Sequence, residues 1–537
     1  MEKEKWALIS VYNKGGIVDF AKRLVAKNWK IIASGGTAKK LLEAGITVRD
    51  VAELVGGGAI LKHRVVTLSR EIHAGLLADL NDPEQVKEMQ ELKLPIIEMV
   101  VCDFYPLSEA IAKSDATIES VIELTDIGGP TMVRSAAKGG RIVICNFEDR
   151  EIVLKEIEEK NEVSIETKQR LRAVSEATVA NYCLESAKFH SKNSFSGRIG
   201  KLIIVPKYGE NAYQSPAGVY SSENNDLLAI DKFRVVAGTE PSYNNICDID
   251  RLLQTLSHID NAFQKNFSEK TKICVGVKHG NPCGAAVSNS GEDAAKKMAL
   301  GDTRAIFGGL VMCNFDIDEK IAETLVSAGQ KEGFTQKFDG IIAPSFSEEA
   351  IETLSRKKGK CRLIENPALA EKLSLDESDR IRNVRGGFLL QPNYNFVLDL
   401  KDKEIITIGK KIEGIEKDLL LAWAIGCTSN SNTITIVKDG MLIGNGTGQQ
   451  DRVGAAELAI KRAIDSGHKE KISGSAAYSD SFFPFPDAPE VLIKAGVKAI
   501  FSTSGSINDK LTQDLCEKNN VVLYQLPDAK ARGFSWH

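Results

Sequence analysis

The stretch Ile31-Ile-Ala-Ser-Gly-Gly-Thr37 is a short apolar run that ends in small residues and leads into the amphipathic segment Thr37–Ala44. This pattern predicts a strand, a tight turn and a helix. The same alternation extends on both sides, from Trp6 to about Arg150. Alternation at this spacing predicts a mostly parallel sheet covered by helices. The fold class expected for this region is therefore α/β.

The elements of this first region can be assigned individually. The expected strands are Trp6–Val11, Ile31–Ala33, Met99–Phe104 and Arg141–Cys145, and the expected helices are Ile17–Lys27, Thr37–Ala44 and Pro130–Lys138. Glu151–Phe189 has the apolar periodicity of one continuous helix. Ser191–Gly200 then becomes small and polar, so we place a domain boundary there. The first domain is expected to span 1–195 and the second 200–537.

The second region is also expected to be α/β. Its predicted strands are Lys272–Val277, Leu310–Cys313, Thr433–Val437, Val497–Phe501 and Val521–Leu526, and its predicted helices are Asp248–Ala262, Ile321–Ala328, Asp418–Ile425, Val453–Ile464 and Asp509–Glu517. Two halves, about 200–365 and 366–537, each combine strands with polar loops rich in glycine or serine. This favours an ancient duplication, which sequence similarity alone is too weak to prove.

Composition excludes several classes of protein. The 537 residues carry 69 basic and 73 acidic side chains, a net charge of −4, with no long charged block. Neither a nucleic-acid partner nor a membrane surface is expected. The longest apolar runs, such as Pro95–Val101, are far shorter than the roughly 20 residues of a membrane span. Ten cysteines without a C-x-x-C pair, and a start without a signal-peptide pattern, predict a cytoplasmic protein.

Two neighbouring loops of the first region favour a phosphate site. Ser34–Thr37 offers hydroxyls and the exposed amides of a helix N-terminus, and the loop Ser10–Gly16 adds the cation Lys14. Each loop alone is equally consistent with ordinary βα-turn chemistry. Both follow strand C-terminal ends, where α/β proteins bind ligands, so together they favour phosphate.

The segment Asp126–Lys138 is a third candidate. Gly128 and Gly129 allow a tight turn before a helix, and Asp126 lies just outside it. Arg134 and Lys138 are four residues apart and share one helix face. A capped surface helix explains this segment equally well.

The segment Val277–Gly284 carries the histidine of greatest interest. His279 follows a buried strand and precedes a turn, and the adjacent lysine disfavours the imidazolium form, which leaves a neutral ring able to accept a proton. A catalytic role is favoured over a structural one. Zinc deaminases carry H-x-E and P-C-x-x-C, but residue 281 is Asn and residue 286 is Ala. A catalytic zinc is therefore not expected.

Three further loops follow strands of the second region. Leu442–Arg452 is rich in glycine, but Gln449 breaks the dinucleotide fingerprint, so an anion site at Arg452 is the remaining interpretation. Ser479–Pro486 and Ser502–Ser506 are polar loops. Phe482, Phe483 and Phe485 are expected to be exposed and able to stack on a planar ring, although packing in the core is the commoner role of phenylalanine.

Taken in order, these segments resemble the bifunctional AICAR transformylase/IMP cyclohydrolase family of purine biosynthesis over essentially the whole chain. The motifs that carry the resemblance are Ser10–Gly16, Ala33–Thr37, Asp126–Lys138, Lys278–Gly284, Phe307–Gly309, Asp339–Pro344, Gly446–Arg452 and Ser479–Phe485. The resemblance implies a three-layer N-terminal domain like methylglyoxal synthase, then two cytidine-deaminase-like α/β halves without zinc. It also implies a homodimer that forms formyl-AICAR from AICAR and 10-formyltetrahydrofolate and then closes it to IMP. A structural monovalent cation is left open.

The resemblance also assigns roles to residues. It implies that Lys278 and His279 catalyse formyl transfer and that Tyr105, Asp126 and Lys138 catalyse ring closure. The substrate-binding positions that it implies are Ser10, Lys14, Ser34, Gly35, Gly36, Thr37, Arg64, Thr67, Lys207, Tyr208, Gly309, Asp339, Asn432, Arg452, Phe483 and Arg532.

The chain departs from the family pattern at several positions. Val66 stands where a cyclohydrolase-site lysine is usual, so the alternative is a monofunctional transformylase, unless Lys62, His63 or Arg70 substitutes. Further departures are Lys207 in place of arginine, Tyr213 in place of histidine and Cys427 in place of lysine. A zinc deaminase and a non-catalytic nucleotide-binding protein are the other classes that we consider.

Overall fold

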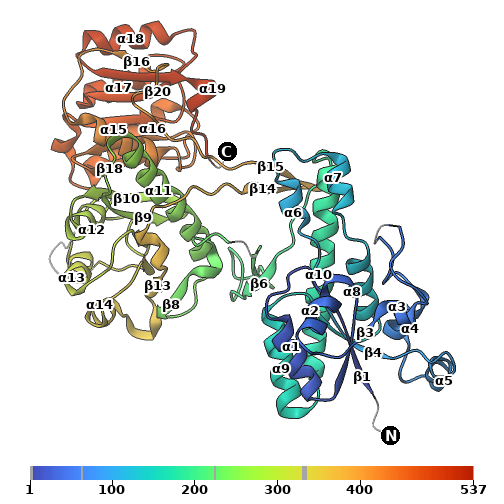
Figure 1. Ribbon diagram of the computed structural model, residues 1–537. Coiled ribbons are helices and arrows are strands. Elements are labelled where there is room, and N and C mark those ends of the chain that lie inside the picture. The colour runs from blue at the N-terminus through green and yellow to red at the C-terminus, as the bar shows by residue number, and fades with distance from the viewer. Residues whose placement is uncertain (1–3, 62–63, 223–224, 329–335, 536–537) are drawn as a thin grey trace. The chain divides into compact units, whose positions relative to one another are not determined.

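The computed structural model describes residues 4–61, 64–222, 225–328 and 336–535 (Figure 1). The chain divides into two compact units, Met1–Ile199 and Gly200–His537, which are described separately.

The first unit is built on a five-stranded, all-parallel sheet with the order β3-β2-β1-β4-β5. Its strands are β1 (Lys5–Ser10), β2 (Trp29–Ala33), β3 (Val48–Asp50), β4 (Ile97–Cys102) and β5 (Ile142–Ile144). Its helices are α1 (Ile17–Ala26), α2 (Gly35–Glu43), α3 (Val51–Leu54), α4 (Arg70–Leu77), α5 (Pro83–Glu91), α6 (Leu107–Ile111), α7 (Ile118–Glu123), α8 (Gly128–Lys138), α9 (Glu148–Lys160) and α10 (Ile165–His190).

Both faces of this sheet are covered. One apolar cluster joins the sheet to α1, α2 and α9, and a second joins it to α4, α8 and α10. Strands β4 and β5 are buried on both faces, which explains why their sequences are continuous apolar runs rather than alternating ones. The strands predicted from the alternation all lie in this sheet.

The prediction of a single helix over Glu151–Phe189 is wrong, because the chain forms two helices, α9 and α10, with a break between them. Asn161 ends α9 in the left-handed conformation, with φ 58°. Ser164 begins α10, and its side-chain oxygen accepts a hydrogen bond from the backbone N–H of Thr167 at 3.2 Å. The apolar periodicity continues on either side of this break, so periodicity alone could not reveal it.

The second unit contains one sheet of twelve strands with the order β16-β21-β20-β19-β17-β18-β10-β9-β11-β12-β13-β8. Its strands are β8 (Arg234–Ala237), β9 (Lys272–Lys278), β10 (Asn281–Ser288), β11 (Leu310–Cys313), β12 (Gly340–Ala343), β13 (Arg362–Glu365), β16 (Ile406–Ile408), β17 (Ile434–Lys438), β18 (Met441–Gly446), β19 (Ala476–Ser479), β20 (Ala499–Ser504) and β21 (Val522–Pro527). Two smaller sheets pair β6 (Lys201–Ile204) with β7 (Val219–Ser221) and β14 (Asp379–Val384) with β15 (Gly387–Pro392).

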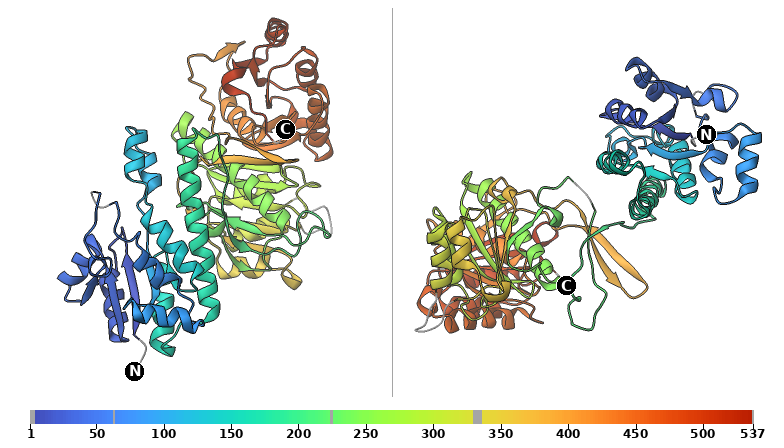
Figure 2. Two further views of the ribbon diagram at one scale, coloured as in Figure 1. Left: turned by 90° about the vertical axis from the view of Figure 1, so that its right-hand side faces the viewer. Right: turned by 90° about the horizontal axis from the view of Figure 1, so that it is seen from below.

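Helices cover both faces of the large sheet (Figure 2). One face carries α11 (Tyr243–Phe267) and α15 (Ile415–Gly426). The other face carries α12 (Gly291–Ala299), α13 (Glu319–Ser327), α14 (Glu348–Leu354), α16 (Arg452–Asp465), α17 (Asp487–Ala495) and α18 (Asp509–Lys518). The short elements are η1 (Ile230–Lys232), η2 (Lys357–Gly359), η3 (Pro367–Ala370), η4 (Lys469–Ile472) and α19 (Asp528–Ala531).

The two halves of the large sheet have the same topology. The order β10-β9-β11-β12-β13-β8 is repeated as β18-β17-β19-β20-β21-β16, with the same parallel and antiparallel pairings. The halves join where β10 pairs with β18 in antiparallel fashion, at Ala286 and Met441. We call this pairing the seam. The repeat extends to single turns, because Lys278-His279-Gly280 occupies the hairpin position that Lys438-Asp439-Gly440 occupies in the second half.

The prediction that Leu442–Arg452 is a glycine-rich loop is partly wrong, because residues up to Gly446 form strand β18. A Cβ atom at Gly444 would lie 2.2 Å from the carbonyl oxygen of Ala459, and one at Gly446 would lie 2.0 Å from that of Ala455. These two glycines therefore allow α16 to approach the sheet closely. Only Thr447–Asp451 remains as a loop.

Candidate active sites

The first candidate site lies at the carboxyl ends of β1 and β2. Ser34 is the N-cap of α2, and Gly35 has a φ of 51°, which favours glycine. The Cε atom of Lys14 is 3.8 Å from where a Cβ atom of Gly36 would lie, so the lysine lies against the start of α2. Burial lowers the pKa of the Lys14 ammonium, and the negative charge of Asp103 acts in the opposite direction. A cation and a helix N-terminus thus converge, an arrangement suited to phosphate.

Thr37 has a different position from the one expected of a phosphate ligand. Its side chain is only 4% exposed, and its hydroxyl donates to the carbonyl of Val11 at 3.2 Å and accepts from the N–H of Val11 at 3.3 Å. It therefore connects the loop after β1 to α2. Ser10 is half-buried at the end of β1.

The carboxylate of Asp126 is held by the start of α8. It accepts a hydrogen bond from the N–H of Gly129 at 2.8 Å, and the backbone N–H of Asp126 donates to the Tyr182 hydroxyl at 2.7 Å. Burial raises the pKa of Asp126, and the backbone N–H of Gly129 acts against this shift. Thr67 belongs to the same place, because its Oγ1 is 3.0 Å from where a Cβ atom of Gly128 would lie.

Tyr105 connects the loops after β1 and β4. Its ring packs edge-on against Tyr12 at a centroid distance of 5.5 Å, and it is 49% exposed. Asp103 accepts hydrogen bonds from the backbone N–H groups of Tyr12 and Asn13, the second at 3.2 Å. Tyr105 therefore lies at the rim of the strand ends, beside the predicted phosphate loops.

The structure does not place Lys138 beside the carboxylate of Asp126. The two residues lie at opposite ends of α8, which at 1.5 Å per residue separates them by roughly 15 Å. Both line a groove of about 790 Å³ between α8 and α10. Arg64 is exposed and forms an ion pair with Glu123.

Val66 is half-buried and packs against the apolar cluster that includes Leu8, Ile32 and Ile72. Of the three residues considered as its substitutes, Arg70 is exposed at the start of α4, and its guanidinium lies 3.4 Å from the carboxylate of Glu71. Lys62 and His63 lie outside the described residues.

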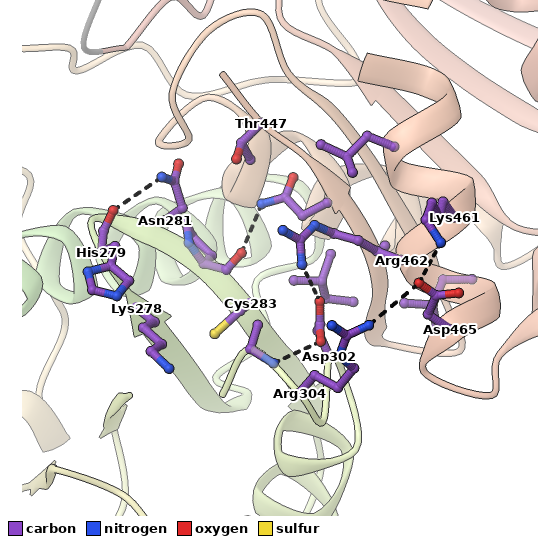
Figure 3. A pocket seen from close by; sticks show the side chains of 17 residues that line it. Lys278, His279, Asn281, Cys283, Asp302, Arg304, Thr447, Lys461, Arg462 and Asp465 are labelled. Carbon is purple, nitrogen blue, oxygen red and sulfur yellow. Dashed lines mark hydrogen bonds and ion pairs between the residues drawn. The ribbon is translucent and has the colours of Figure 1, made fainter. Parts of the chain in front are cut away.

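The second candidate site lies between the halves of the large sheet (Figure 3). Lys278 and His279 line a cavity of about 590 Å³, with Asn281 and Cys283 from β10 and Arg462 from α16. His279 and Gly280 form the two-residue turn of the β9–β10 hairpin, with φ values of 52° and 71°. Two positive φ values identify a type I′ turn.

Lys278 also lies close to the loop that precedes β11. Its Nζ donates to the carbonyl of Phe307 at 2.7 Å. The Nζ of Lys278 and the Oδ1 of Asp339 are each 4.0 Å from where a Cβ atom of Gly308 would lie. The structure therefore brings together Lys278, Gly309 and Asp339, three of the residues predicted from sequence.

A second group of predicted residues surrounds Asp480, which sequence reasoning did not single out. Asp480 is fully buried, and its carboxylate accepts from Arg452 Nη2 at 3.2 Å, Ser431 Oγ at 2.6 Å and the N–H of Thr433 at 3.0 Å. Burial raises the pKa of Asp480, and the positive charge of Arg452 opposes the shift. Asn432 follows Ser431, and its side chain donates to the carbonyl of Gln449 at 2.9 Å.

Asn281 connects the two groups. Its amide nitrogen donates to the carbonyl of His279 at 3.3 Å, and its amide oxygen accepts from the backbone N–H of Asn430 at 3.0 Å. The C-terminal segment joins the second group, because Ser535 forms a β-bridge with Asn430. Arg532 lies over the ring of Phe534 at 5.1 Å from its centroid.

Three predicted residues are placed elsewhere. Lys207 and Tyr208 follow β6, which pairs only with β7 among the described strands, and no described contact brings them to His279. The expectation that Phe483 is exposed is wrong: its ring is 1% exposed and packs in the core under α16 and α17. Phe485 is the exposed phenylalanine of this loop, with 61% of its surface accessible to solvent.

Within the described ranges, no group of three or more His, Cys, Asp or Glu side chains is arranged to hold a metal ion. Burial raises the pKa of the Cys283 thiol well above its usual range, which disfavours the thiolate that zinc binds. That the protein holds no zinc stays a prediction, and so does the possible monovalent cation.

No helix in the part of the chain described is long and apolar enough to cross a bilayer.

Comparison with known proteins gives matches over nearly the whole chain. Residues 16–131 match the family described as "MGS-like domain", and residues 136–462 match the "AICARFT/IMPCHase bienzyme". The "Bifunctional purine biosynthesis protein PurH" of Bacillus cytotoxicus is 39% identical over 519 residues, covering 94% of this chain and 95% of that relative. The protein of the same name from Fusobacterium nucleatum is 37% identical over 526 residues, which cover 97% of this chain and 98% of that relative.

Proposed function

Because the chain belongs to the AICARFT/IMPCHase bienzyme family, we propose how its own residues carry out the two reactions of that family. The protein is a bifunctional AICAR transformylase and IMP cyclohydrolase that catalyses the final steps of de novo IMP synthesis. An MGS-like domain is followed by the AICARFT/IMPCHase region. The repeated strand order of the second unit supports the further proposal that this unit consists of two deaminase-like halves.

For formyl transfer, the observation that carries the proposal is the position of His279 on a tight turn, with Lys278 at the end of the preceding strand, at the cavity between the halves. His279 accepts a proton from the AICAR amine as its nitrogen attacks the formyl carbon. Lys278 directs its ammonium toward the oxygen that becomes negative. The carbon–nitrogen bond of the donor then breaks, and the proton passes to the departing nitrogen. AICAR becomes formyl-AICAR, and the folate leaves without its formyl group.

The family implies a folate co-substrate, and we propose 10-formyltetrahydrofolate as the donor. Gly309 and Asp339 lie close to Lys278, and Asn432 and Arg452 lie around Asp480. These four residues are the ones we assign to substrate binding in this unit. Lys207, Tyr208 and Arg532 stay predictions, and Phe483, which is buried in the core, is not assigned to substrate binding.

The assay that tests this proposal supplies AICAR with 10-formyltetrahydrofolate and resolves formyl-AICAR from IMP by chromatography. We expect formyl-AICAR to appear first and IMP to follow. Consumption of the donor without formyl-AICAR would overturn the assignment of the donor. A second sample that receives formyl-AICAR alone measures ring closure by itself.

For ring closure, we propose that the phosphate lies at the start of α2, with Lys14, Ser34, Gly35 and Gly36 around it. Asp126 and Tyr105 border the same strand ends and are the candidates for proton transfer. Ring closure joins an amide nitrogen to a formyl carbon of the same molecule, so positioning supplies much of the rate. Lys138, at the far end of α8, and Ser10, Thr37, Arg64 and Thr67 stay predictions.

The absence of a lysine at position 66 is expected to limit the rate of ring closure. We expect the Val66→Lys variant to convert supplied formyl-AICAR to IMP about tenfold faster, because a fixed ammonium stabilises developing negative charge. The lysine stem can cover the apolar cluster while its charged end stays in water. Val66→Met is the uncharged control of similar length. Equal rates in the two variants would contradict the prediction.

We also propose that the enzyme is a homodimer. The β14–β15 hairpin pairs with no other strand in the described part of the chain, and it extends from the large sheet as a separate ribbon in Figure 2. Side chains on both of its faces are exposed, and among them Phe388, Leu389 and Leu390 are apolar. An isolated two-stranded hairpin is marginally stable in water, so a second copy of the chain would both cover and stabilise it.

Substitution on this hairpin is expected to separate the subunits. Light scattering of the parent protein should give a mass near twice 58.5 kDa, and the double variant Phe388→Glu/Leu390→Glu should give a mass near 58.5 kDa at the same concentration. Leu511→Glu places the same charge on another exposed apolar side chain, on α18, and should remain dimeric. A dimeric hairpin variant would exclude the hairpin from the interface.

A further inference from the structure

The turn that carries His279 is held by a side chain from another element. Asp248 lies on α11, and its Oδ1 accepts a hydrogen bond from the N–H of Gly280 at 2.7 Å. The backbone N–H of His279 also lies near this carboxylate and lowers its pKa. Asp248 therefore holds the two-residue turn through the backbone N–H of Gly280. From these contacts we infer that Asp248 is a positioning residue for formyl transfer, an inference that rests on the proposed role of His279.

The conformation of His279 explains why such a contact is needed. A φ of 52° is uncommon for a residue with a side chain, and the first position of a type I′ turn favours asparagine, aspartate or glycine. A histidine adopts this conformation only where the surroundings fix it. Asp248 fixes the turn from α11, and Asn281 holds the carbonyl of His279 at 3.3 Å.

The helix that carries Asp248 is fixed by its N-terminal cap and by its packing in the core. The α11 helix begins with a capping box, in which Ser242 and Asn245 exchange hydrogen bonds with each other's backbone N–H groups. Its apolar residues pack against β9 and α15 in the core of the unit. Asp248 lies in the second turn, where the helix is already anchored. The carboxylate of Asp248 thus connects the backbone of the His279 turn to the core.

The second half of the sheet contains the same contact without a histidine. Asp418 lies on α15, the counterpart of α11, and its carboxylate accepts from the N–H groups of Asp439 at 2.8 Å and Gly440 at 2.7 Å. The lysines that precede the two turns are also equivalent, because Lys438 donates to the carbonyl of Gly474 at 3.1 Å as Lys278 does to that of Phe307.

Because the same contact occurs in both halves, the structural role of Asp248 can be tested separately from its proposed role in the reaction. Both carboxylates stabilise a hairpin, so removing either is expected to destabilise the unit. Only the first turn carries a residue assigned to proton transfer. Asp418 therefore provides a matched control, with the same side chain, a hydrogen bond to the equivalent glycine N–H and the same fold position.

The test compares Asp248→Ala with Asp418→Ala in the full-length enzyme, using saturating AICAR and 10-formyltetrahydrofolate. We expect Asp248→Ala to lower kcat for formyl transfer about a hundredfold, the effect of misplacing a catalytic group by about 1 Å. The KM for AICAR should stay within about threefold, because Asp248 is not assigned to binding. Asp418→Ala should keep kcat within about twofold of the parent. Ring closure of supplied formyl-AICAR, catalysed by the other unit, should be unchanged in both.

A double substitution shows whether Asp248 acts through His279. In a His279→Asn background, Asp248→Ala should lower the residual rate by less than about twofold, because the group that it positions is gone. A further hundredfold loss would overturn the inference, as would equal rates for Asp248→Ala and Asp418→Ala. If His279→Asn alone keeps the parental rate, the proposed base is wrong and the inference falls with it.

A milder variant keeps the test available if the alanine variant does not fold. Asp248→Asn retains an oxygen for the N–H of Gly280 and loses the negative charge near the backbone of His279, so an intermediate loss of about tenfold is expected. Asp418→Asn is its control. Circular dichroism and the ring-closure rate report whether each protein is folded. A parental kcat in Asp248→Asn would count against the inference.

Discussion

The His279→Asn enzyme is expected to transfer formyl groups about a thousandfold more slowly than the parent enzyme, because general-base catalysis contributes roughly 10²- to 10⁴-fold. Asparagine is a sharper choice than alanine here. His279 has a φ of 52° in a type I′ turn, and Asn-Gly is the sequence that such turns favour. The variant therefore removes the imidazole while preserving the hairpin.

The measurement is kcat for formyl-AICAR formation, with thermal unfolding as the check on the hairpin. We expect a melting temperature equal to or above that of the parent. Ring closure of supplied formyl-AICAR should be unchanged, since we assign it to the first unit. Addition of free imidazole should restore part of the lost rate. A near-parental kcat would remove His279 from the mechanism.

The largest effect on stability is expected at Asp480. Its carboxylate is fully buried and binds Arg452, Ser431 and Thr433. Asp480→Ala leaves the guanidinium of Arg452, itself only 14% exposed, without this partner, and breaking a buried ion pair in this way costs roughly 3–5 kcal/mol. The same change should abolish formyl transfer, because Asn432 and Arg452 lose their fixed positions.

Urea unfolding compared across variants tests this prediction. Asp451→Ala removes the exposed cap of α16, one residue from Arg452, and should cost only about 1 kcal/mol. The double variant Asp480→Ala/Arg452→Met should recover part of the loss, because no buried charge is left unpaired. Equal destabilisation by Asp480→Ala and Asp451→Ala would contradict the argument.

The elements of the fold were predictable where burial imposes a pattern along the chain. Strands such as β4 and β11 are buried on both faces, so they appear as continuous apolar runs. The break at Asn161 was not predictable, because it depends on one left-handed residue inside an unbroken periodicity. Strand β18 was missed for a related reason, since Gly444 and Gly446 serve the approach of α16 rather than a turn.

The candidate sites were predictable in part. The type and neighbours of His279 singled it out, the family resemblance added Lys278, and both line a cavity in the structure. Asp248, Asn281 and Asp480 were missed because their importance lies in partners far away in sequence, such as Gly280 for Asp248 and Arg452 for Asp480. Asp480 falls within a loop that had been singled out, whereas Asp248 carries no local signal in the helix that contains it.

The seam between β10 and β18 has a consequence for how the enzyme is made. All strands of the first half lie between Arg234 and Glu365, and all those of the second between Ile406 and Pro527. A ribosome therefore releases every strand of the first half before the second half is synthesised, whereas the face of α11 that packs against α15 is covered only afterwards. The hydrogen bond from Asn430 to Asn281 can form once Asn430 has been synthesised, and the bridge from Asn430 to Ser535 can form only after Ser535. The site that we propose for formyl transfer is thus completed only after both halves have been synthesised.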